Sequence, residues 1–203
     1  MKIICIGRNY INHTKELGNA VPTEPVFFLK PDTAISPKGH PFFIPEFTNN
    51  IHYEVELVIK INRIGKHIEK QFAHKYYNEI GLGIDFTARD IQEEVKAKGL
   101  PWEKAKGFDG SAVISRSFIP KEELKINNIY FSLIKNGENV QEGNSKDMLF
   151  NFDKIIAYIS QFYTLKIGDL IYTGTPAGVG QVANGDVLEG FIGSQKMFVV
   201  KVR

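Results

Sequence analysis

The stretch from Tyr53 to Ile61 constrains the fold more than any other part of the sequence. Apolar Val55 and Leu57 alternate there with Glu54 and Glu56. This period of two is typical of a β-strand with one apolar face, because successive side chains of a strand point to opposite sides. The stretch therefore predicts a sheet packed against a core, with two acids side by side on its other face.

The size and composition of the chain predict a single globular domain over residues 1–203. Its 203 residues, 43% of them apolar and 12% aromatic, are enough to build a substantial core. The 25 basic and 23 acidic side chains nearly cancel, which gives no electrostatic reason to expect nucleic acid or an anionic membrane as a partner. We therefore expect the partner to be a small molecule.

Cysteine usage and hydropathy predict a cytoplasmic protein. The single cysteine, Cys5, lies in an apolar run and has no second cysteine for an intrachain disulfide, which suits a reducing compartment. The N-terminal apolar run is too short for a signal peptide, and no apolar stretch approaches the roughly 18 residues that span a bilayer. We therefore expect no association with a membrane.

The remaining segments predict an α+β fold in which strands dominate. Short apolar runs at residues 2–7, 26–31 and 42–47 are typical of strands. Residues 129–143 indicate a hairpin that turns at the sequence NGEN, and residues 151–162 carry an apolar stripe at helical spacing. Because such a stripe has to be buried, we expect this helix to pack against a sheet.

A second helix is predicted over residues 88–99, with Asp85 just before it. Thr87 and Asp90 have the spacing of a capping box at its start. Asp85 lies in the apolar context GLGIDFT, where an unpaired carboxylate is expensive to bury. Asp85 could support the helix N-terminus through its neighbours, or it could bind a cation.

Glu54, Glu56 and Asp85 together suggest a metal site. Side chains two residues apart on a strand have Cβ atoms roughly 6.5 to 7 Å apart, so the two glutamates can converge on one cation. With Asp85 they would form an all-oxygen ligand set, which suits Mg²⁺ or Mn²⁺ better than Zn²⁺. The alternative for the two glutamates is an ordinary solvated face of a sheet.

Seven motifs follow one another along the chain: GRNY (7–10), FLKP (28–31), HYEVEL (52–57), GIDFTARDIQ (83–92), GLPWEKAKGFDG (99–110), QEGNSKDM (141–148) and GDLIYTGTPAGVG (168–180). In this order they resemble the fumarylacetoacetate hydrolase superfamily, and within it the small branch of acylpyruvate hydrolases and oxaloacetate decarboxylases. The resemblance runs from about residue 3 to the C-terminus. It implies a β-rich fold of the mixed β-sandwich roll type, assembled as a homodimer.

The resemblance also implies a ligand set. Carried over residue by residue, the ligands of Mg²⁺ or Mn²⁺ are Glu54, Glu56 and Asp85. Asp90 also matches the family pattern, but its position inside a helix favours a supporting hydrogen bond over a metal bond.

His13 and Glu16 match a general-base pair that lies in a lid over the substrate in this branch. A helical turn is predicted over residues 13–17, and a spacing of three puts both side chains on one face of it. The carboxylate could then orient the imidazole and raise its basicity. The alternative is an exposed helix face with two unrelated polar residues.

Five further residues are candidates for contacting the substrate or assisting the reaction, and three of them match family positions. Lys106 matches an active-site lysine, Gln92 an active-site amide and Thr175 a hydroxyl that contacts the substrate. Arg8 and Lys30 are candidates for binding an anionic substrate. The ordinary alternatives are a surface lysine and a solvated glutamine.

The resemblance implies an enzyme that hydrolyses a carbon–carbon bond in acylpyruvates, giving pyruvate and a carboxylic acid. His13 would activate water, while the metal and Lys106 would stabilise the negative charge on the departing pyruvate enolate. The same chemistry would serve an oxaloacetate decarboxylase or tautomerase, or a 2-hydroxyhepta-2,4-diene-1,7-dioate isomerase. A catalytically silent module that binds a metal or an organic acid is the alternative from another class of protein.

Overall fold

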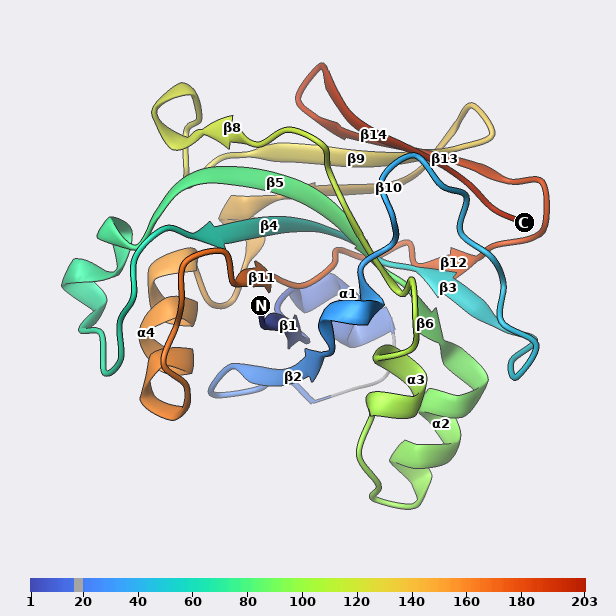
Figure 1. The fold of residues 1–203 in the computed structure, drawn as a ribbon, viewed down its shortest axis with the longest axis horizontal. Helices are drawn as coiled ribbons and strands as arrows, with labels where there is room; N and C mark the ends of the chain where they lie inside the picture. Colours follow the sequence, from blue (N-terminus) through green and yellow to red (C-terminus); the bar gives the residue numbers. More distant parts are fainter. Residues whose placement is uncertain (17–19) are drawn as a thin grey trace.

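The computed structural model describes residues 1–16 and 20–203. Within this part, strands outnumber helices, which confirms the strand-dominated α+β fold (Figure 1). The strands are β1 (Ile3–Gly7), β2 (Val26–Lys30), β3 (Ile51–Tyr53), β4 (Val55–Ile61), β5 (Tyr77–Asp85), β6 (Thr87–Ala88), β7 (Ala112–Ile114), β8 (Ile119–Pro120), β9 (Tyr130–Lys135), β10 (Glu138–Asn144), β11 (Leu170–Tyr172), β12 (Gly180–Gln181), β13 (Val187–Ile192) and β14 (Gln195–Lys201). The α-helices are α1 (Ile11–Glu16), α2 (Arg89–Ala97), α3 (Glu103–Lys106) and α4 (Phe152–Phe162).

Strands β4 and β5 run through the middle of the largest sheet. Among the described residues this sheet has seven strands, in the order β2-β1-β11-β4-β5-β7, and β8 also pairs with β5. Its pairs are antiparallel, apart from the parallel pair of β1 and β11. A four-stranded sheet, β10-β9-β13-β14, lies above β4 and β5 in Figure 1. Strands β12, β3 and β6 form a third, smaller sheet beside them.

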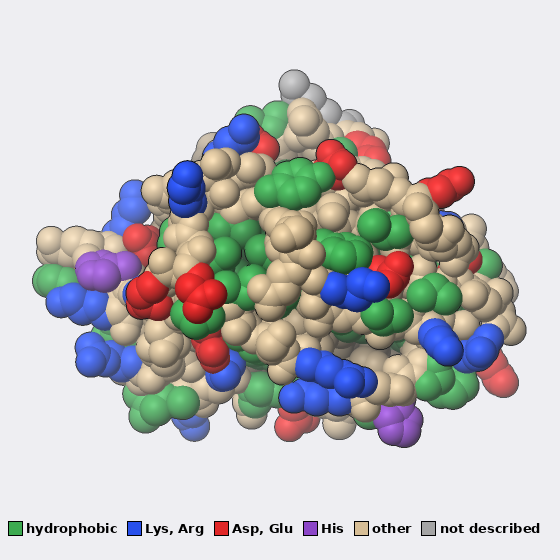
Figure 2. All heavy atoms as spheres, turned by 90° about the horizontal axis from the view of Figure 1, so that it is seen from above, with side chains coloured by type: hydrophobic (Ala, Val, Ile, Leu, Met, Phe, Trp, Pro, Cys, Tyr) green, Lys and Arg blue, Asp and Glu red, His purple; other side chains and the backbone are tan. Residues whose placement is uncertain are grey.

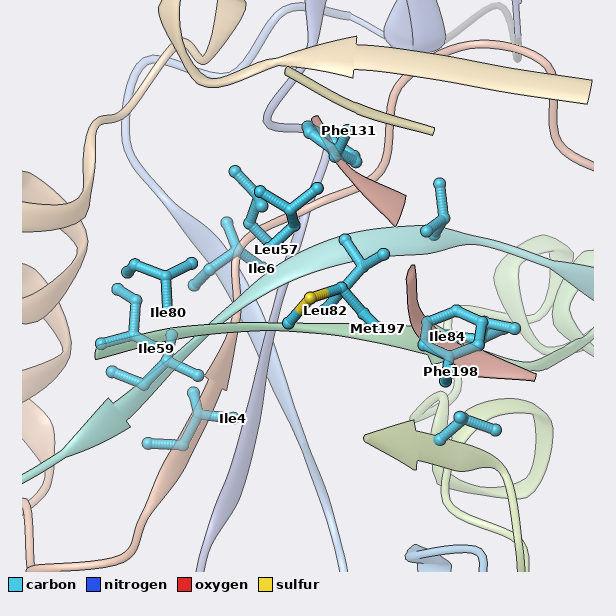
Figure 3. Close-up of a cluster of buried hydrophobic side chains, with 14 of the residues drawn as sticks. Ile4, Ile6, Leu57, Ile59, Ile80, Leu82, Ile84, Phe131, Met197 and Phe198 are labelled. Carbon is cyan, nitrogen blue, oxygen red and sulfur yellow. The ribbon is translucent and has the colours of Figure 1, made fainter. Parts of the chain in front are cut away.

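The main hydrophobic core lies between the two larger sheets (Figure 3). Leu57 and Ile59 of β4 point into it, and Phe131 of β9 meets them from the other sheet. Val58, between the two, belongs instead to a second apolar cluster with Cys5 on the opposite side of β4. The period of two in the sequence therefore separates two buried faces, and not a buried face from a solvated one.

The apolar stripe at residues 151–162 forms helix α4, as predicted. Phe152, Ile155 and Ile159 are buried in the main core. Asn151 caps the helix, because its side-chain oxygen accepts a hydrogen bond from the N–H of Lys154 at 3.0 Å.

The hairpin predicted over residues 129–143 is also confirmed. Strands β9 and β10 pair antiparallel on either side of Asn136 and Gly137. These two residues have φ angles of 54° and 87°, the left-handed conformation that an Asn-Gly turn adopts with little strain.

The capping box predicted at Thr87 and Asp90 is wrong. Helix α2 begins at Arg89, and no side chain caps it. The hydroxyl of Thr87 instead donates to the carboxylate of Glu54 at 3.0 Å. Asp90 accepts hydrogen bonds from the Thr48 hydroxyl at 2.6 Å and from a backbone N–H, which is the supporting role expected for it.

Charged side chains of both signs are interspersed over the face seen in Figure 2. This distribution matches the near balance of basic and acidic residues in the sequence. Among the described residues, none of the helices combines the length and the apolar character that crossing a membrane requires.

Asn9 links three segments that are far apart in the sequence. Its side chain is fully buried, and its amide donates to the carbonyls of Phe150 at 3.0 Å and of Thr173 at 2.7 Å. Its side-chain oxygen accepts the N–H of Phe150 at 2.8 Å. Every polar atom of this amide is thus used to hold the segment after β1 against the loops before α4 and after β11.

We predict that Asn9→Ala lowers the free energy of unfolding by about 2 to 4 kcal/mol, because it leaves buried backbone groups without partners. Urea unfolding followed by circular dichroism measures the change. Asn127→Ala is the matched control, since Asn127 is exposed, and it should change the stability by less than about 0.5 kcal/mol. Equal stability of the two variants would contradict the role given to Asn9.

Candidate active site

The three predicted ligands, Glu54, Glu56 and Asp85, meet where β4 begins and β5 ends. The antiparallel register sets Glu56 opposite Gly83, and the N–H of Asp85 donates to the carbonyl of Glu54 at 2.8 Å. One carboxylate oxygen from each acid lies within 4.8 Å of the others. The three residues are 5%, 2% and 1% exposed. The glutamates therefore do not lie on a solvated face. Their carboxylates converge, as their spacing along the strand allows.

Basic side chains from three different elements surround two of these acids. The ammonium of Lys106, from α3, donates to Glu54 and to Asp85, both at 2.8 Å. The guanidinium of Arg89, from α2, donates to Glu54 at 2.6 Å. The ammonium of Lys30, from β2, lies 2.7 Å from the other oxygen of Asp85. Glu54 and Asp85 are thus held in place by charge on both sides.

These contacts shift the protonation equilibria of the site. Burial alone would raise the pKa of Glu54, but the charges of Lys106 and Arg89 lower it well below its usual range. Burial alone would lower the pKa of Lys106, but Asp85 and Glu54 raise it. At neutral pH, Glu54 is therefore a carboxylate and Lys106 an ammonium.

Glu56 is the acid whose charge is least compensated. Among the described residues, no basic side chain lies within ion-pair distance of it. Its hydrogen bond comes from the N–H of Gly174 at 2.6 Å. Burial, and then the charges of Asp85 and Glu54, raise the pKa of Glu56 well above its usual value.

The acid set fits a hard divalent cation. All the candidate ligand atoms are carboxylate oxygens, which Mg²⁺ and Mn²⁺ prefer. The uncompensated Glu56 is the observation that favours a bound cation, since a buried carboxylate without a positive partner is costly.

Gly174 can make its contact with Glu56 only because it lacks a side chain. Its φ angle is 96°, a conformation that other residues rarely adopt. A Cβ atom at this position would lie 2.7 Å from the Cβ of Asn9. The glycine in the sequence TGTP therefore lets the backbone approach the acids closely.

Thr175 lines the same cavity, but its hydroxyl already has partners in the protein. It donates to the carbonyl of Val55 at 2.9 Å and accepts from the amide of Gln141 at 2.9 Å. The side-chain oxygen of Gln141 in turn accepts the N–H of Val55 at 2.9 Å. Gln141, which the sequence analysis did not single out, thus fixes the loop after β11 to the start of β4.

His13 and Glu16 form the expected pair on helix α1. Nδ1 of His13 lies 3.2 Å from a carboxylate oxygen of Glu16, and the Glu16 carboxylate also accepts the N–H of Gly178 at 3.1 Å. His13 is only 6% exposed and lines the cavity that holds the three acids. It therefore does not lie on an exposed helix face. Leu17, the last residue of the predicted helical turn, lies outside the described residues.

The remaining predicted residues fall into two groups. Gln92 and Arg8 line the cavity, and the carbonyl oxygen of Gln92 accepts from Arg89 at 2.6 Å. Lys30 stands behind Asp85 instead, where its ammonium also donates to the carbonyl and the hydroxyl of Ser111, both at 3.0 Å. This position makes Lys30 a support for Asp85 and not part of the cavity wall.

Six residues that line the cavity were not predicted from the sequence: Ile6, Gly7, Phe28, Arg89, Lys96 and Trp102. One signal for Arg89 exists, because a cation in the first turn of a helix is unfavourable next to the positive end of the helix dipole. Its presence there indicates a strong partner elsewhere, which the structure identifies as Glu54. Periodicity gives no comparable signal for Trp102 or Phe28, since aromatic residues are ordinary in cores.

The sequence matches the family model described as fumarylacetoacetate (FAA) hydrolase C-terminal over residues 2–200. The chain thus combines a strand-rich fold, a cavity lined by buried carboxylates and a family match over nearly its whole length. The chain belongs to the fumarylacetoacetate hydrolase family, and the resemblance seen in its motifs is confirmed.

Individual relatives cover most of the chain as well. The mitochondrial oxaloacetate tautomerase of Bos taurus is 44% identical over 191 residues, 94% of this chain and 86% of that protein. The mitochondrial oxaloacetate decarboxylase of Dictyostelium discoideum is 45% identical over 190 residues, 93% of this chain and 87% of that protein.

A crystal structure of fumarylpyruvate hydrolase from Pseudomonas aeruginosa in complex with Mn²⁺ and pyruvate has the same fold. Its TM-score is 0.93 at 34% identity, and the match covers 100% of this chain and 89% of that one. These relatives are enzymes named for small keto acids. The cytoplasmic location and the homodimer stay predictions.

We predict that Glu56→Gln abolishes Mg²⁺ and Mn²⁺ binding, because an amide supplies no negative charge to the ion. Isothermal titration calorimetry with each ion measures the loss. Thermal unfolding of the metal-free variant should resemble that of the wild type, since among the described residues Glu56 forms no ion pair that the substitution would break.

Glu189→Gln is the control for Glu56→Gln. Glu189 lies on β13 and pairs with the exposed Lys196, so its variant should bind both ions as the wild type does. Wild-type affinity in Glu56→Gln would show that Glu56 is not a ligand.

Proposed function

We propose that the chain is a divalent-metal-dependent enzyme that interconverts the enol and keto forms of oxaloacetate. The position of His13 carries this proposal. A carboxylate-paired imidazole lines the same cavity as three buried carboxylates. Keto–enol tautomerisation needs a group that moves protons and a site that stabilises negative charge on the keto acid oxygen. Relatives named oxaloacetate tautomerase support the choice of substrate.

Glu54, Glu56 and Asp85 are the residues that would hold Mg²⁺ or Mn²⁺. When bound, the ion supplies Lewis-acid stabilisation of negative charge on the keto acid oxygens. The Mn²⁺ in the related hydrolase supports a metal of this kind. Lys106 and Arg89 hold the carboxylate of Glu54 in position, and Lys106 also holds that of Asp85.

His13 is the residue that would move a proton at C3 of the substrate. If Nδ1 carries the proton that faces Glu16, the other ring nitrogen is left to accept one. Conversion of enol to keto removes a proton from the enol oxygen and adds one to C3. Glu16 would hold the ring in the correct tautomer and stabilise it while it is charged.

Gln92 is placed to bind a substrate oxygen. Its carbonyl oxygen is occupied by Arg89, while among the described residues its NH₂ group has no hydrogen-bond acceptor. Gln92 is 4% exposed and lines the cavity. This NH₂ group is therefore available to donate to an acceptor on the substrate.

Acylpyruvate hydrolysis, which the motifs favoured, now ranks behind tautomerisation. The relatives named for oxaloacetate are 44% and 45% identical, against 34% for the fumarylpyruvate hydrolase. Hydrolysis further requires a water molecule aligned against a second carbonyl, whereas tautomerisation needs only the proton transfer. Oxaloacetate decarboxylation is the second candidate, supported by the name of the Dictyostelium discoideum relative.

Crystalline enol-oxaloacetic acid provides the test of the proposed function. After it dissolves in buffer with the Mg²⁺-loaded protein, the ultraviolet absorbance of the enol should fall faster than without protein, and EDTA should remove the difference. Malate dehydrogenase with NADH measures the keto product, and lactate dehydrogenase measures pyruvate.

The products distinguish the candidate reactions. Keto-oxaloacetate formed without matching pyruvate supports the tautomerase. Pyruvate released from oxaloacetate at the rate of enol loss would instead support the decarboxylase. Cleavage of acetylpyruvate alone would support the hydrolase. Tight metal binding without turnover of any of these acids would leave a silent binding module.

We predict that His13→Ala loses about 10²- to 10⁴-fold in turnover of enol-oxaloacetate, the usual contribution of general acid–base catalysis. Its affinity for Mg²⁺ should not change, because His13 is not among the acids that meet at the site. Stopped-flow absorbance and calorimetry measure the two quantities. The neighbouring Asn12, exposed on the same helix, gives the control Asn12→Ala, which should keep full turnover. Full turnover in His13→Ala would rule out its role as the base.

A further inference from the structure

Two lysines lie along one aromatic wall of the cavity. The ammonium of Lys106 is 5.3 Å from the ring centre of Phe28, and that of Lys96 is 5.5 Å from the ring centre of Trp102. The two rings are themselves in contact, with centres 5.9 Å apart. Lys106 is buried beside the acids, whereas Lys96 and Trp102 are half-buried. The wall therefore runs from the acids toward the mouth of the cavity, with a cation at each end.

The two cations differ in what balances their charge. Lys106 is paired with Glu54 and Asp85. Among the described residues, no carboxylate lies within ion-pair distance of Lys96, and no acceptor bonds its ammonium. Burial, and then the positive charges of Arg89 and Arg8, lower the pKa of Lys96. Of the cations at this end of the cavity, Lys96 is therefore one whose charge no carboxylate among the described residues pairs with.

An anion at the mouth would relieve this imbalance. Within residues 1–16 and 20–203 the ammonium of Lys96 donates to no acceptor, and it lies over the face of Trp102, which limits the freedom of the side chain to reorient. The keto acid end of a substrate belongs at the other end, beside the acids. The mouth would then bind a second negative group of the same small molecule, a few bonds away from its keto acid end.

Building on the proposed function, we propose that Lys96 binds the second carboxylate of a keto-dicarboxylic acid and so makes the enzyme prefer dicarboxylic over monocarboxylic keto acids. Lys96 is then a specificity-determining residue. Arg8 lines the same cavity and adds to the field that attracts the anion. The two carboxylates of oxaloacetate, separated by two carbon atoms, have the charge pattern that this cavity matches.

Two ligands that cannot tautomerise test this role by their binding. In 3,3-difluoro-oxaloacetate and 3,3-difluoro-2-oxobutanoate, C3 carries no hydrogen, so neither can enolise, and they differ by a carboxylate in place of a methyl group. Calorimetry with the Mg²⁺-loaded protein should show tighter binding of the dicarboxylate. Lys96→Met, which keeps the length of the side chain against Trp102, should weaken that binding roughly 10- to 100-fold and leave the monocarboxylate unaffected.

Two further variants complete the experiment. Lys96→Arg should restore most of the preference, because it returns the charge. Lys98→Met is the matched control, since Lys98 follows the same helix, is exposed and pairs with Glu94, and it should bind both ligands as the wild type does. Equal weakening of both ligands in Lys96→Met, or of neither, would overturn the proposal.

The outcome is separable from that of the proposed function. A wild-type protein that prefers the dicarboxylate through Lys96, yet does not speed up loss of enol-oxaloacetate, would overturn the tautomerase alone. A working tautomerase in which Lys96→Met leaves the preference intact would overturn only the role of Lys96.

Discussion

Three carboxylates buried in one small cavity create the electrostatic problem on which the rest of the structure depends. Removing each carboxylate from water costs several kcal/mol unless a positive group or hydrogen bonds compensate it. Lys30, Lys106 and Arg89 come from three separate elements to meet Glu54 and Asp85. Strand β2 and helices α2 and α3 are therefore held to the large sheet by charge as well as by apolar packing. Glu56 has no such positive partner among the described residues.

Strand β4 belongs to the core and to the site at the same time. Leu57 and Ile59 pack between the two larger sheets, while Glu56 on the opposite side faces the cavity. A slip of one residue in the register with β5 would exchange the two sets of side chains. The packing of the core thus sets the positions of the acids, because the same strand carries both sets of side chains.

Local patterns predicted the parts of the fold that depend on neighbouring residues. The period of two in β4, the Asn-Gly hairpin and the stripe of α4 all follow from interactions within a few residues, and the structure confirms them. Segments more than 20 residues away along the chain cover the acid-bearing face of β4. The local pattern therefore left open a solvated face for Glu54 and Glu56. The capping box failed for the same reason: Thr87 has a better partner in Glu54, 33 residues away.

The candidate site was predicted in outline through its motifs, but not in its arrangement. The acids, His13 and Gln92 line one cavity as expected, whereas Lys30 stands behind Asp85. Lys96 and Gln141 make contacts with other segments that no spacing along the chain encodes. A lysine or glutamine on a helix or strand is ordinarily solvated, so only the assembled structure distinguishes these from surface residues.

The loops around the cavity are joined by uncharged amides. Asn9 and Gln141 are fully hydrogen-bonded, and together they fix the segments that carry Gly174 and Thr175. Amide side chains neither gain nor lose protons over the pH range in which carboxylates and imidazoles titrate. The contacts made by these two amides are therefore insensitive to pH, unlike the charged pairs inside the cavity. A pH profile of this enzyme reports the ionisation of the groups inside the cavity, without a contribution from loosening of the walls that these two amides hold.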